Sequence, residues 1–407
     1  MTSNSILNEL DLPKGKLVRA FPSAPWPHFE PDEIEAAVHV LQSGQINYKT
    51  GEEGRRFEKE FATYAGCKYG IAVANGTVAL ELALYGLGIG AGDEVVVPSR
   101  TFIASASCVV MRGAIPVVAE VDALSQNITA DTIRPLLTAR TKAIIAVHLA
   151  GWPCDMDSIL ALARDRGIKV IEDCAQAHGA TYKGRPVGSL GDAAAFSFCQ
   201  DKIMTTGGEG GILTTQDHRI AERAKSFRDH GTNGNGTGKD QPASGYRWIH
   251  NSFGTNWRLT EMQSAIGRVQ LRKLSQWVAV RRRNASLLTK RLAGCPALDV
   301  NVPPKEIGHS YYKYYVFVRP EQLRTGQNRN RIMASINAEG IPCFSGICSE
   351  IYLEKAFPEK LRPTQRLAVA KRLGETSMMF LVHPTLSEQD MLDTCNAIEK
   401  AMHSAAR

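Results

Sequence analysis

The sequence predicts an α/β protein with a mostly parallel sheet of about seven strands and a smaller α+β domain at its C-terminal end. Short apolar runs rich in β-branched residues alternate with helical stretches between residues 30 and 230. These runs are almost continuously apolar, which is typical of strands that are buried on both faces. After residue 299 the texture changes to an aromatic strand and further helices. The 407 residues, of which 43% are hydrophobic, suffice for two globular domains.

Each element rests on a local signal. Asp32 and Glu33 lie in the first turn of an expected helix, where the helix dipole favours acids, and Gly44 ends it. The further helices expected in the first part of the chain are residues 55–65, 78–84, a stretch that begins at 101–106, 130–137, 157–166 and 218–227. The expected strands are 71–73, 95–98, 116–118, 143–147, 169–171, 195–198 and 212–215.

The organisation of the remaining chain follows the same reasoning. A capping pattern at 257–261 begins a long amphipathic helix that runs to about residue 291, long enough to link two domains. Beyond it we expect a strand at 311–318, a helix at 329–339, a strand at 341–344 and a helix at 387–403. The predicted units are a proline-rich arm (1–30), a large α/β domain (31–270) and a small α+β domain (271–407). The Gly- and Asn-rich stretch 229–245 is long for a loop, which favours a functional or disordered segment.

Composition excludes several classes of function. The net charge of +7 is a mild excess of 48 basic over 41 acidic residues, and we interpret the basic run 281–283 as a solvated helix face. No interleaving of aromatic and basic residues points to nucleic acid. The nine cysteines are scattered without a C-x-x-C pair, which argues against disulfides and a zinc site and predicts no bound metal. Without a signal peptide or a long apolar run we expect no membrane contact and a cytoplasmic protein.

The stretch 172–211 carries the strongest indication of chemistry. An apolar run ends at Asp173, and a second one, which contains Ser197, leads to Lys202 in a Gly-rich turn. The carboxyl ends of parallel strands form the edge where α/β proteins bind ligands. A lysine at that edge suggests a Schiff-base lysine. The alternatives are a capping role for Asp173 and a solvated turn for Lys202.

A second motif indicates phosphate binding. Asn75-Gly76-Thr77 stands between a strand and a helix, so the first free N–H groups of that helix and the Thr77 hydroxyl can bind an anion. A plain helix cap is the alternative interpretation.

Seven motifs of this chain occur in the same order in the members of a known protein family. They are Asn75-Gly76-Thr77, GDEVVVPSRTFIASA (92–106), TKAIIAVHLAGWPCDMDSI (141–159), EDCAQAHGATYKG (172–184), GDAAAFSFCQDK (191–202), GGEGG (207–211) and GTNWRLTEMQSAIGRVQL (254–271). From about residue 30 to its end the chain resembles the DegT/DnrJ/EryC1/StrS family of sugar aminotransferases, which depend on pyridoxal 5′-phosphate. The resemblance implies a fold-type-I transferase.

The resemblance also implies roles for eight residues. Lys202 would hold pyridoxal phosphate covalently and move the proton, and Asp173 would keep the ring nitrogen protonated. Gln176 would lie near the phenolic oxygen and Phe102 would stack on the ring. Gly76, Thr77 and Ser197 would bind the phosphate, and Asn256 would reach it from the second subunit of a homodimer with shared active sites. Packing in the core is the alternative for Phe102, and helix capping is the alternative for Asn256.

The implied reaction is transamination. L-glutamate or L-glutamine would be the donor and a keto-sugar, most naturally a nucleotide-linked one, the acceptor, in surface-polysaccharide or antibiotic-sugar synthesis. A keto-cyclitol of the scyllo-inosose type and a non-catalytic sensor or regulator are the alternatives. Lys202 argues against the family's dehydratases, which have histidine at this position. The chain departs from the family pattern at Tyr352, where many members have histidine, and in the stretch 229–245.

Overall fold

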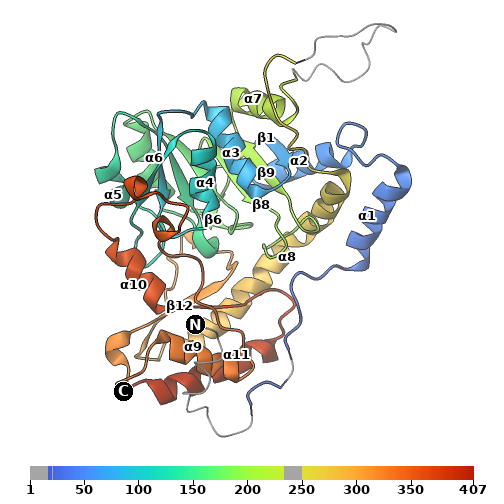
Figure 1. The fold of residues 1–407 in the computed structure, drawn as a ribbon. Coiled ribbons are helices and arrows are strands. Elements are labelled where there is room, and N and C mark those ends of the chain that lie inside the picture. The colour runs from blue at the N-terminus through green and yellow to red at the C-terminus, as the bar shows by residue number, and fades with distance from the viewer. Residues whose placement is uncertain (1–16, 21, 233–249) are drawn as a thin grey trace, which may run out of the picture.

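A seven-stranded sheet forms the centre of the larger part of the molecule (Figure 1). The structure, a computed structural model, describes residues 17–20, 22–232 and 250–407. In spatial order the strands are β1 (Tyr69–Val73), β9 (Gly211–Thr215), β8 (Ala193–Ser197), β5 (Lys169–Asp173), β4 (Thr141–Val147), β2 (Glu94–Pro98) and β3 (Ile115–Ala119). Only β9 runs antiparallel to its neighbours; the pairs from β8 to β3 are parallel. The predicted α/β class with a mostly parallel sheet is confirmed.

Both faces of this sheet are covered, which explains the continuously apolar strands. Val95 and Val97 pack in one core, whereas Val96 between them packs in another, because successive side chains of a strand point to opposite faces. The helices of the larger part are α1 (Pro31–Ser43), α2 (Glu53–Tyr64), α3 (Gly76–Leu87), α4 (Ala104–Met111), α5 (Ala130–Ile133), α6 (Met156–Arg164) and α7 (His218–Arg228). Helices α3, α4 and α7 contribute to the first core and α6 to the second.

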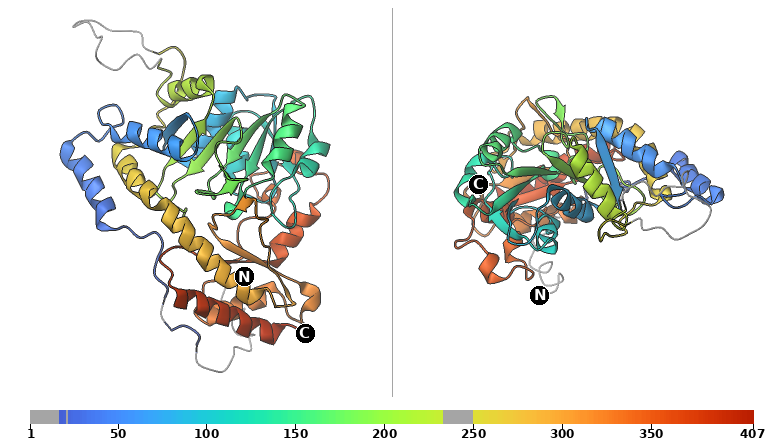
Figure 2. Two further views of the ribbon diagram at one scale, coloured as in Figure 1. Left: turned by 180° about the vertical axis from the view of Figure 1, so that it is seen from behind. Right: turned by 90° about the horizontal axis from the view of Figure 1, so that it is seen from above.

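A long helix, α8 (Glu261–Leu292), connects this part to a smaller one (Figure 2). Thr260 and Gln263 cap its start reciprocally, as the sequence predicted. The smaller part holds the sheet of β10 (Leu298–Asp299), β12 (Tyr314–Val318) and β13 (Ser377–Phe380), with helices α9 (Arg329–Ala338), α10 (Ala368–Thr376) and α11 (Glu388–Ala405). A third small sheet consists of β6 (Thr181–Tyr182), β7 (Arg185–Pro186) and β11 (Ile307–Gly308).

Two predicted elements differ from the structure. Residues 341–344 do not form a strand: Phe344 makes an isolated bridge to Met379, and Pro342 lacks the N–H that a ladder needs. The strands that pair with β12 are β10 and β13, and the sequence analysis predicted neither. The helix expected at 130–137 is α-helical only to Ile133, because Pro135 forces a tighter turn.

Other predictions fall partly outside the described residues. Residues 233–245 of the Gly- and Asn-rich stretch and residues 1–16 and 21 of the arm are not described. The arm residue Trp26 packs edge-on against Trp277 of α8, with 5.1 Å between the ring centroids. The predicted domain boundary at 270 falls inside α8 and stays a prediction. Among the described helices, none combines the length and hydropathy that crossing a bilayer requires.

Candidate active site

A cavity of about 910 Å³ lies where the carboxyl edge of the central sheet faces β12 and β13 of the smaller one. Asp173 ends β5, Ser197 ends β8, and Gly76 and Thr77 begin α3. Seven of the eight predicted site residues line this cavity: Gly76, Thr77, Phe102, Asp173, Gln176, Ser197 and Lys202. The fold therefore brings residues 126 positions apart in the chain to one wall, as parallel strand ends predict.

Asp173 is a buried carboxylate with few partners. Its Oδ2 accepts a hydrogen bond from the Ser105 hydroxyl at 3.0 Å and its Oδ1 accepts one from the Ala175 N–H at 3.1 Å. Burial raises the pKa of Asp173, and the hydrogen bonds from Ala175 and Ser105 offset this only in part. The site thus holds a carboxylate that a cation inside the cavity would stabilise.

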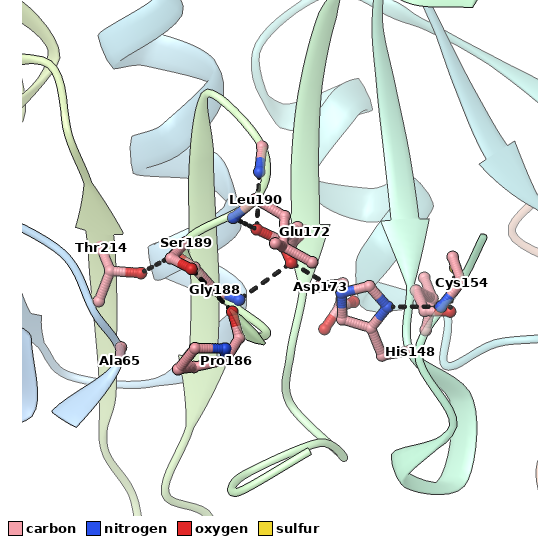
Figure 3. Close-up of polar contacts among 12 residues, drawn as sticks. Ala65, His148, Cys154, Glu172, Asp173, Pro186, Gly188, Ser189, Leu190 and Thr214 are labelled. Carbon is pink, nitrogen blue, oxygen red and sulfur yellow. Dashed lines mark hydrogen bonds and ion pairs between the residues drawn. The ribbon is translucent and has the colours of Figure 1, made fainter. Parts of the chain in front are cut away.

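Glu172, which precedes Asp173 in β5, fixes the end of this strand through hydrogen bonds (Figure 3). Its fully buried carboxylate accepts N–H groups from Gly188 at 2.9 Å, Leu190 at 2.7 Å and Gly191 at 2.8 Å, and bonds to His148 Nε2 at 2.9 Å. Because His148 Nδ1 accepts the N–H of Cys154, its Nε2 carries the proton.

This network reaches Asp173 through the backbone. The His148 N–H donates to the Asp173 carbonyl at 3.1 Å. His148, to which the sequence analysis gave no role, therefore helps to fix the position of Asp173.

The start of α3 forms a cradle against β8. Asn75 caps the helix by accepting the N–H of Val78 at 3.0 Å, which leaves the first N–H groups of the helix free to face the cavity. A Cβ on Gly76 would lie 2.6 Å from Ser197 Cβ, so only glycine allows this approach. The hydroxyls of Thr77 and Ser197 border the same space. This arrangement suits a phosphate or another anion.

Lys202 lies in the loop between β8 and β9, half-buried at the cavity. Its Nζ is 3.4 Å from the Tyr312 hydroxyl and 3.4 Å from Asp201 Oδ1, and its carbonyl accepts the Trp26 indole N–H at 2.8 Å. Burial alone would raise the pKa of Asp201, but Lys202 and the Tyr312 hydroxyl outweigh it and lower that pKa. Lys202 is therefore held by the fold and is not a freely solvated turn lysine.

Phe102 and Gln176 occupy the cavity walls in different ways. Phe102 is 63% exposed, so the alternative of a core aromatic is wrong. Gln176 is buried, and its Oε1 accepts the Ala150 N–H at 2.8 Å, which leaves its amide nitrogen available. Each side chain thus presents to the cavity the kind of surface its predicted role requires, a ring face for one and a donor for the other.

Two further positions lie elsewhere. Asn256 is exposed and outside the cavity of its own subunit, so its predicted contact with a partner subunit stays a prediction. Tyr352 is buried, bonded to Glu350 and to the Leu367 N–H, and does not line the cavity. Phe344 and Ile347 of that region do line it.

Sequence reasoning missed the contribution of the second sheet. Tyr312 and Lys313 line the cavity just before β12, and Tyr312 also bonds to Asp201. Arg281, interpreted above as part of a solvated face, is fully buried and donates to the Tyr312 carbonyl at 3.2 Å; only its neighbours Arg282 and Arg283 are exposed. The pattern HSYYKYYV gave no signal, because its aromatic residues are equally typical of an ordinary strand.

Comparison with known proteins identifies the family. Residues 27–399 match the model of the DegT/DnrJ/EryC1/StrS aminotransferase family. GDP-perosamine synthase of Caulobacter vibrioides is 38% identical over 379 residues, covering 92% of this chain and 97% of that protein. UDP-N-acetyl-3-dehydro-alpha-D-glucosamine 3-aminotransferase of Acidithiobacillus ferrooxidans is 36% identical over 382 residues, covering 92% and 96%.

A solved structure gives the same result for the fold. The aminotransferase from Psychrobacter cryohalolentis superimposes with a TM-score of 0.91 at 53% identity, over 93% of this chain and 98% of that one. The predicted family and fold-type-I class are confirmed. The chain belongs to the DegT/DnrJ/EryC1/StrS aminotransferase family and is an aminotransferase.

Proposed function

We propose that this aminotransferase uses pyridoxal 5′-phosphate to transfer the amino group of L-glutamate or L-glutamine to a nucleotide-linked keto-sugar. The observation that carries the proposal is the cavity that combines a held lysine, Lys202, with a buried carboxylate, Asp173, beside an anion cradle. The two relatives described above are named for GDP- and UDP-linked sugars, which supports a nucleotide-linked acceptor. Such a product suits surface-polysaccharide or antibiotic-sugar synthesis.

The residues present fit the cofactor. The start of α3, with Thr77 and Ser197, offers donors for a phosphate, and the Gly76 position has no room for a side chain between them. The buried position of Asp173, which raises its pKa, supports this carboxylate as the counter-ion of a protonated ring nitrogen. The exposed ring of Phe102 supplies a flat surface for stacking.

The cofactor supplies a pyridine ring that accepts the electron pair released at the substrate's reacting carbon. Asp173 would keep a proton on the ring nitrogen, and the hydrogen bonds that join Thr101 to Ser105 at 2.9 Å and Ser105 to Asp173 at 3.0 Å fix the direction of its carboxylate. Lys202 is the residue that would hold the cofactor covalently, because its Nζ lies at the cavity. The free amine of Lys202 would serve as the group that takes the proton from the donor's α-carbon and gives it back.

Asp201 and Tyr312 hold the Lys202 amine from the other side. Both lie within 3.5 Å of Nζ, so the amine stays at the cavity when its covalent bond is broken. A proton-transfer group works only when it remains within hydrogen-bond reach of the reacting atom.

A homodimer with shared sites is part of the proposal. The exposed side chain of Asn256 and the open face of Phe102 are available to a second copy of the chain. Analytical ultracentrifugation of the intact protein would measure the assembly directly.

The experiment that tests the proposed function is spectroscopic. The purified protein is loaded with pyridoxal phosphate, and its visible absorbance is recorded before and after L-glutamate or L-glutamine is added. Borohydride reduction and peptide mapping then locate the attached cofactor. We expect a band that bleaches with the donor and a label on Lys202. A protein that stays colourless, or a label on Lys183 or Lys313, would refute the assignment.

The acceptor is tested separately. Calorimetry with UDP, GDP and dTDP measures whether a nucleoside diphosphate binds, and UDP-, GDP- and dTDP-linked keto-sugars and scyllo-inosose are offered to the aminated enzyme. Turnover of a nucleotide-linked sugar supports the proposal. Turnover of scyllo-inosose without nucleotide binding would replace it by the keto-cyclitol alternative.

A further inference from the structure

The smaller sheet contributes a second lysine to the cavity. Lys313 immediately precedes β12 and lines the cavity together with Lys202. Its Nζ is 4.8 Å from the centroid of the Tyr312 ring, and Lys202 Nζ is 5.0 Å from the same centroid. The distance between the two ammonium groups therefore cannot exceed the sum of these two values. Lys313 stands within the length of one small substrate from the reacting lysine.

Asp173, Asp201 and Glu209 line the same cavity, but among the described residues no direct ion pair joins any of them to the Lys313 ammonium group, so they act on it only at longer range. Within the described ranges Lys313 makes no hydrogen bond and no ion pair. Asp201, the carboxylate that raises the pKa of Lys313, is already engaged by Lys202 and Tyr312. Arg281, which donates to the Tyr312 carbonyl, is fully buried. Its Nε and one Nη have no hydrogen-bond acceptor among the described residues. A buried cation without a counter-ion destabilises a protein unless a ligand supplies the anion.

The surroundings of Lys313 confirm that its ammonium group is costly to keep there. Burial, opposed by Asp201 and aided by Arg281 and Lys202, lowers the pKa of Lys313 to about 8. Burial also lowers the pKa of Arg281, although a guanidinium keeps its proton in proteins. A lysine that served only solubility would stand on the outer surface, as Lys183 does.

We propose that Lys313 binds the carboxylate that the amino donor carries next to its reacting carbon, an inference that rests on the proposed function. Every α-amino acid has this group one bond from the carbon that reacts, so the anion must lie close to Lys202. Lys313 is a cation at that distance that, apart from the Tyr312 ring, has neither a hydrogen bond nor an ion pair in the part of the chain that the structure describes. It is thus a substrate-binding residue of the smaller part, next to β12, whereas the cavity residues predicted from sequence all belong to the larger part.

The test measures the half-reaction with L-glutamate. Lys313→Met removes the charge and keeps the length of the side chain, and Lys313→Arg keeps the charge. Lys183→Met is the matched control, because Lys183 is an exposed lysine whose ion pair with Asp157 lies at the surface. We expect the glutamate concentration at half-maximal rate to rise by roughly 30-fold or more in Lys313→Met, since truncating one partner of a desolvated pair is costly. Lys313→Arg should recover much of this loss, and the control should match the wild type.

An equilibrium measurement does not depend on turnover. Glutarate has the carboxylates but no amino group, so its affinity for the cofactor-loaded enzyme can be followed by calorimetry against pH. The groups facing Lys313 are Asp201, Lys202, Arg281, Tyr312 and His383; burial lowers the pKa of His383 to about 3 and raises that of Tyr312, so both are neutral near pH 8. Affinity should fall as pH rises through about 8 in the wild type. It should not do so in Lys313→Arg.

The outcomes separate the two proposals. If Lys313→Met keeps the wild-type response to glutamate and the wild-type affinity for glutarate, the inference is wrong even though the enzyme transaminates. If only the keto-sugar half-reaction suffers, Lys313 serves the acceptor and the donor assignment is overturned. If the wild type transfers no amino group at all, the proposed function fails. Should Lys313→Met not fold, Lys313→Gln gives the same comparison, with cofactor capture on Lys202 as the folding control.

Discussion

Replacing Glu172 by glutamine should destabilise the folded protein far more than the loss of one charge suggests. Oε1 of Glu172 accepts two backbone N–H groups and Oε2 accepts one more and the His148 ring (Figure 3). A glutamine must place an NH₂ group where one of these oxygens stood. Two donors then lose their acceptor and face a third donor.

The magnitude follows from this count. A buried N–H without an acceptor costs about 1–3 kcal/mol, so two of them cost about 2–6 kcal/mol. His148 cannot relieve the conflict by changing tautomer, because its Nδ1 would then carry a proton against the Cys154 N–H at 3.0 Å. The site is fully buried, so water cannot replace the missing acceptor without opening the structure.

The effect should depend on pH in a defined direction. Burial opposes ionisation of Glu172, but His148 and the Gly188 and Gly191 N–H groups outweigh it and lower its pKa below 4.5. A carboxyl whose folded-state pKa is depressed stabilises the fold above its unfolded-state pKa, and this contribution is lost as pH falls through the folded-state pKa. The difference between wild type and Glu172→Gln should therefore be complete at pH 7 and shrink below about pH 4.5.

The assay is urea unfolding at pH 7 and at two acidic pH values, with the free energy taken from midpoint and slope. Glu222→Gln is the control, because Glu222 is exposed and its ion pair with Lys225 is a surface one at 3.5 Å. We expect the control to change stability by less than about 0.5 kcal/mol. If Glu172→Gln is as stable as the control at pH 7, the four-donor arrangement around Glu172 is wrong.

Three further substitutions test the site. Lys202→Ala should abolish the glutamate half-reaction while circular dichroism and sedimentation stay those of the wild type; measurable transfer would remove the central assignment. Asp173→Ala should slow the half-reaction on the order of 10²-fold or more, because the ring nitrogen loses its counter-ion; near-normal rates would mean that another carboxylate does this work. Gly76→Ala should cost about 1–3 kcal/mol of stability and weaken cofactor binding, because its Cβ meets Ser197 Cβ at 2.6 Å; unchanged fluorescence titration with pyridoxal phosphate would contradict the cradle.

The hydrophobic periodicity predicted the secondary structure correctly where the local sequence alone determines it. The runs at 95–98 and 143–147 are strands because β-branched residues fill both faces of a covered sheet, and Thr260 begins a helix because its own hydroxyl caps it. The stretch 341–344 was misassigned because pairing partners decide whether such a short run is a strand. Met379 meets Phe344 at one bridge only, and Pro342 cannot extend it.

The residues of the candidate site also fall into those that the local sequence could place and those that it could not. Asp173, Ser197, Gly76 and Thr77 could be placed together from sequence, because parallel strands bring their carboxyl ends and the following helix starts to one edge. Phe102 could not be assigned to core or cavity, since an aromatic residue after a strand is compatible with both; its exposure of 63% decided it. The basic run at 281–283 looked uniform, yet the turn of α8 buries Arg281 beneath Tyr312 and exposes the next two residues.

The sequence by itself thus determined the family, the layered fold and the wall of the cavity that the central sheet provides, because these follow from local patterns and from motifs contiguous in the chain. The tertiary structure alone decided what faces that wall. Tyr312 and Lys313 lie just before strand β12, more than 100 positions beyond Lys202, and no local sequence pattern indicates which residues of the smaller part will face the central sheet. The charge of Lys313 and the hydroxyl of Tyr312 affect Lys202 only because the fold brings them close to it, since electrostatic interactions depend on distance in space and not on separation along the chain.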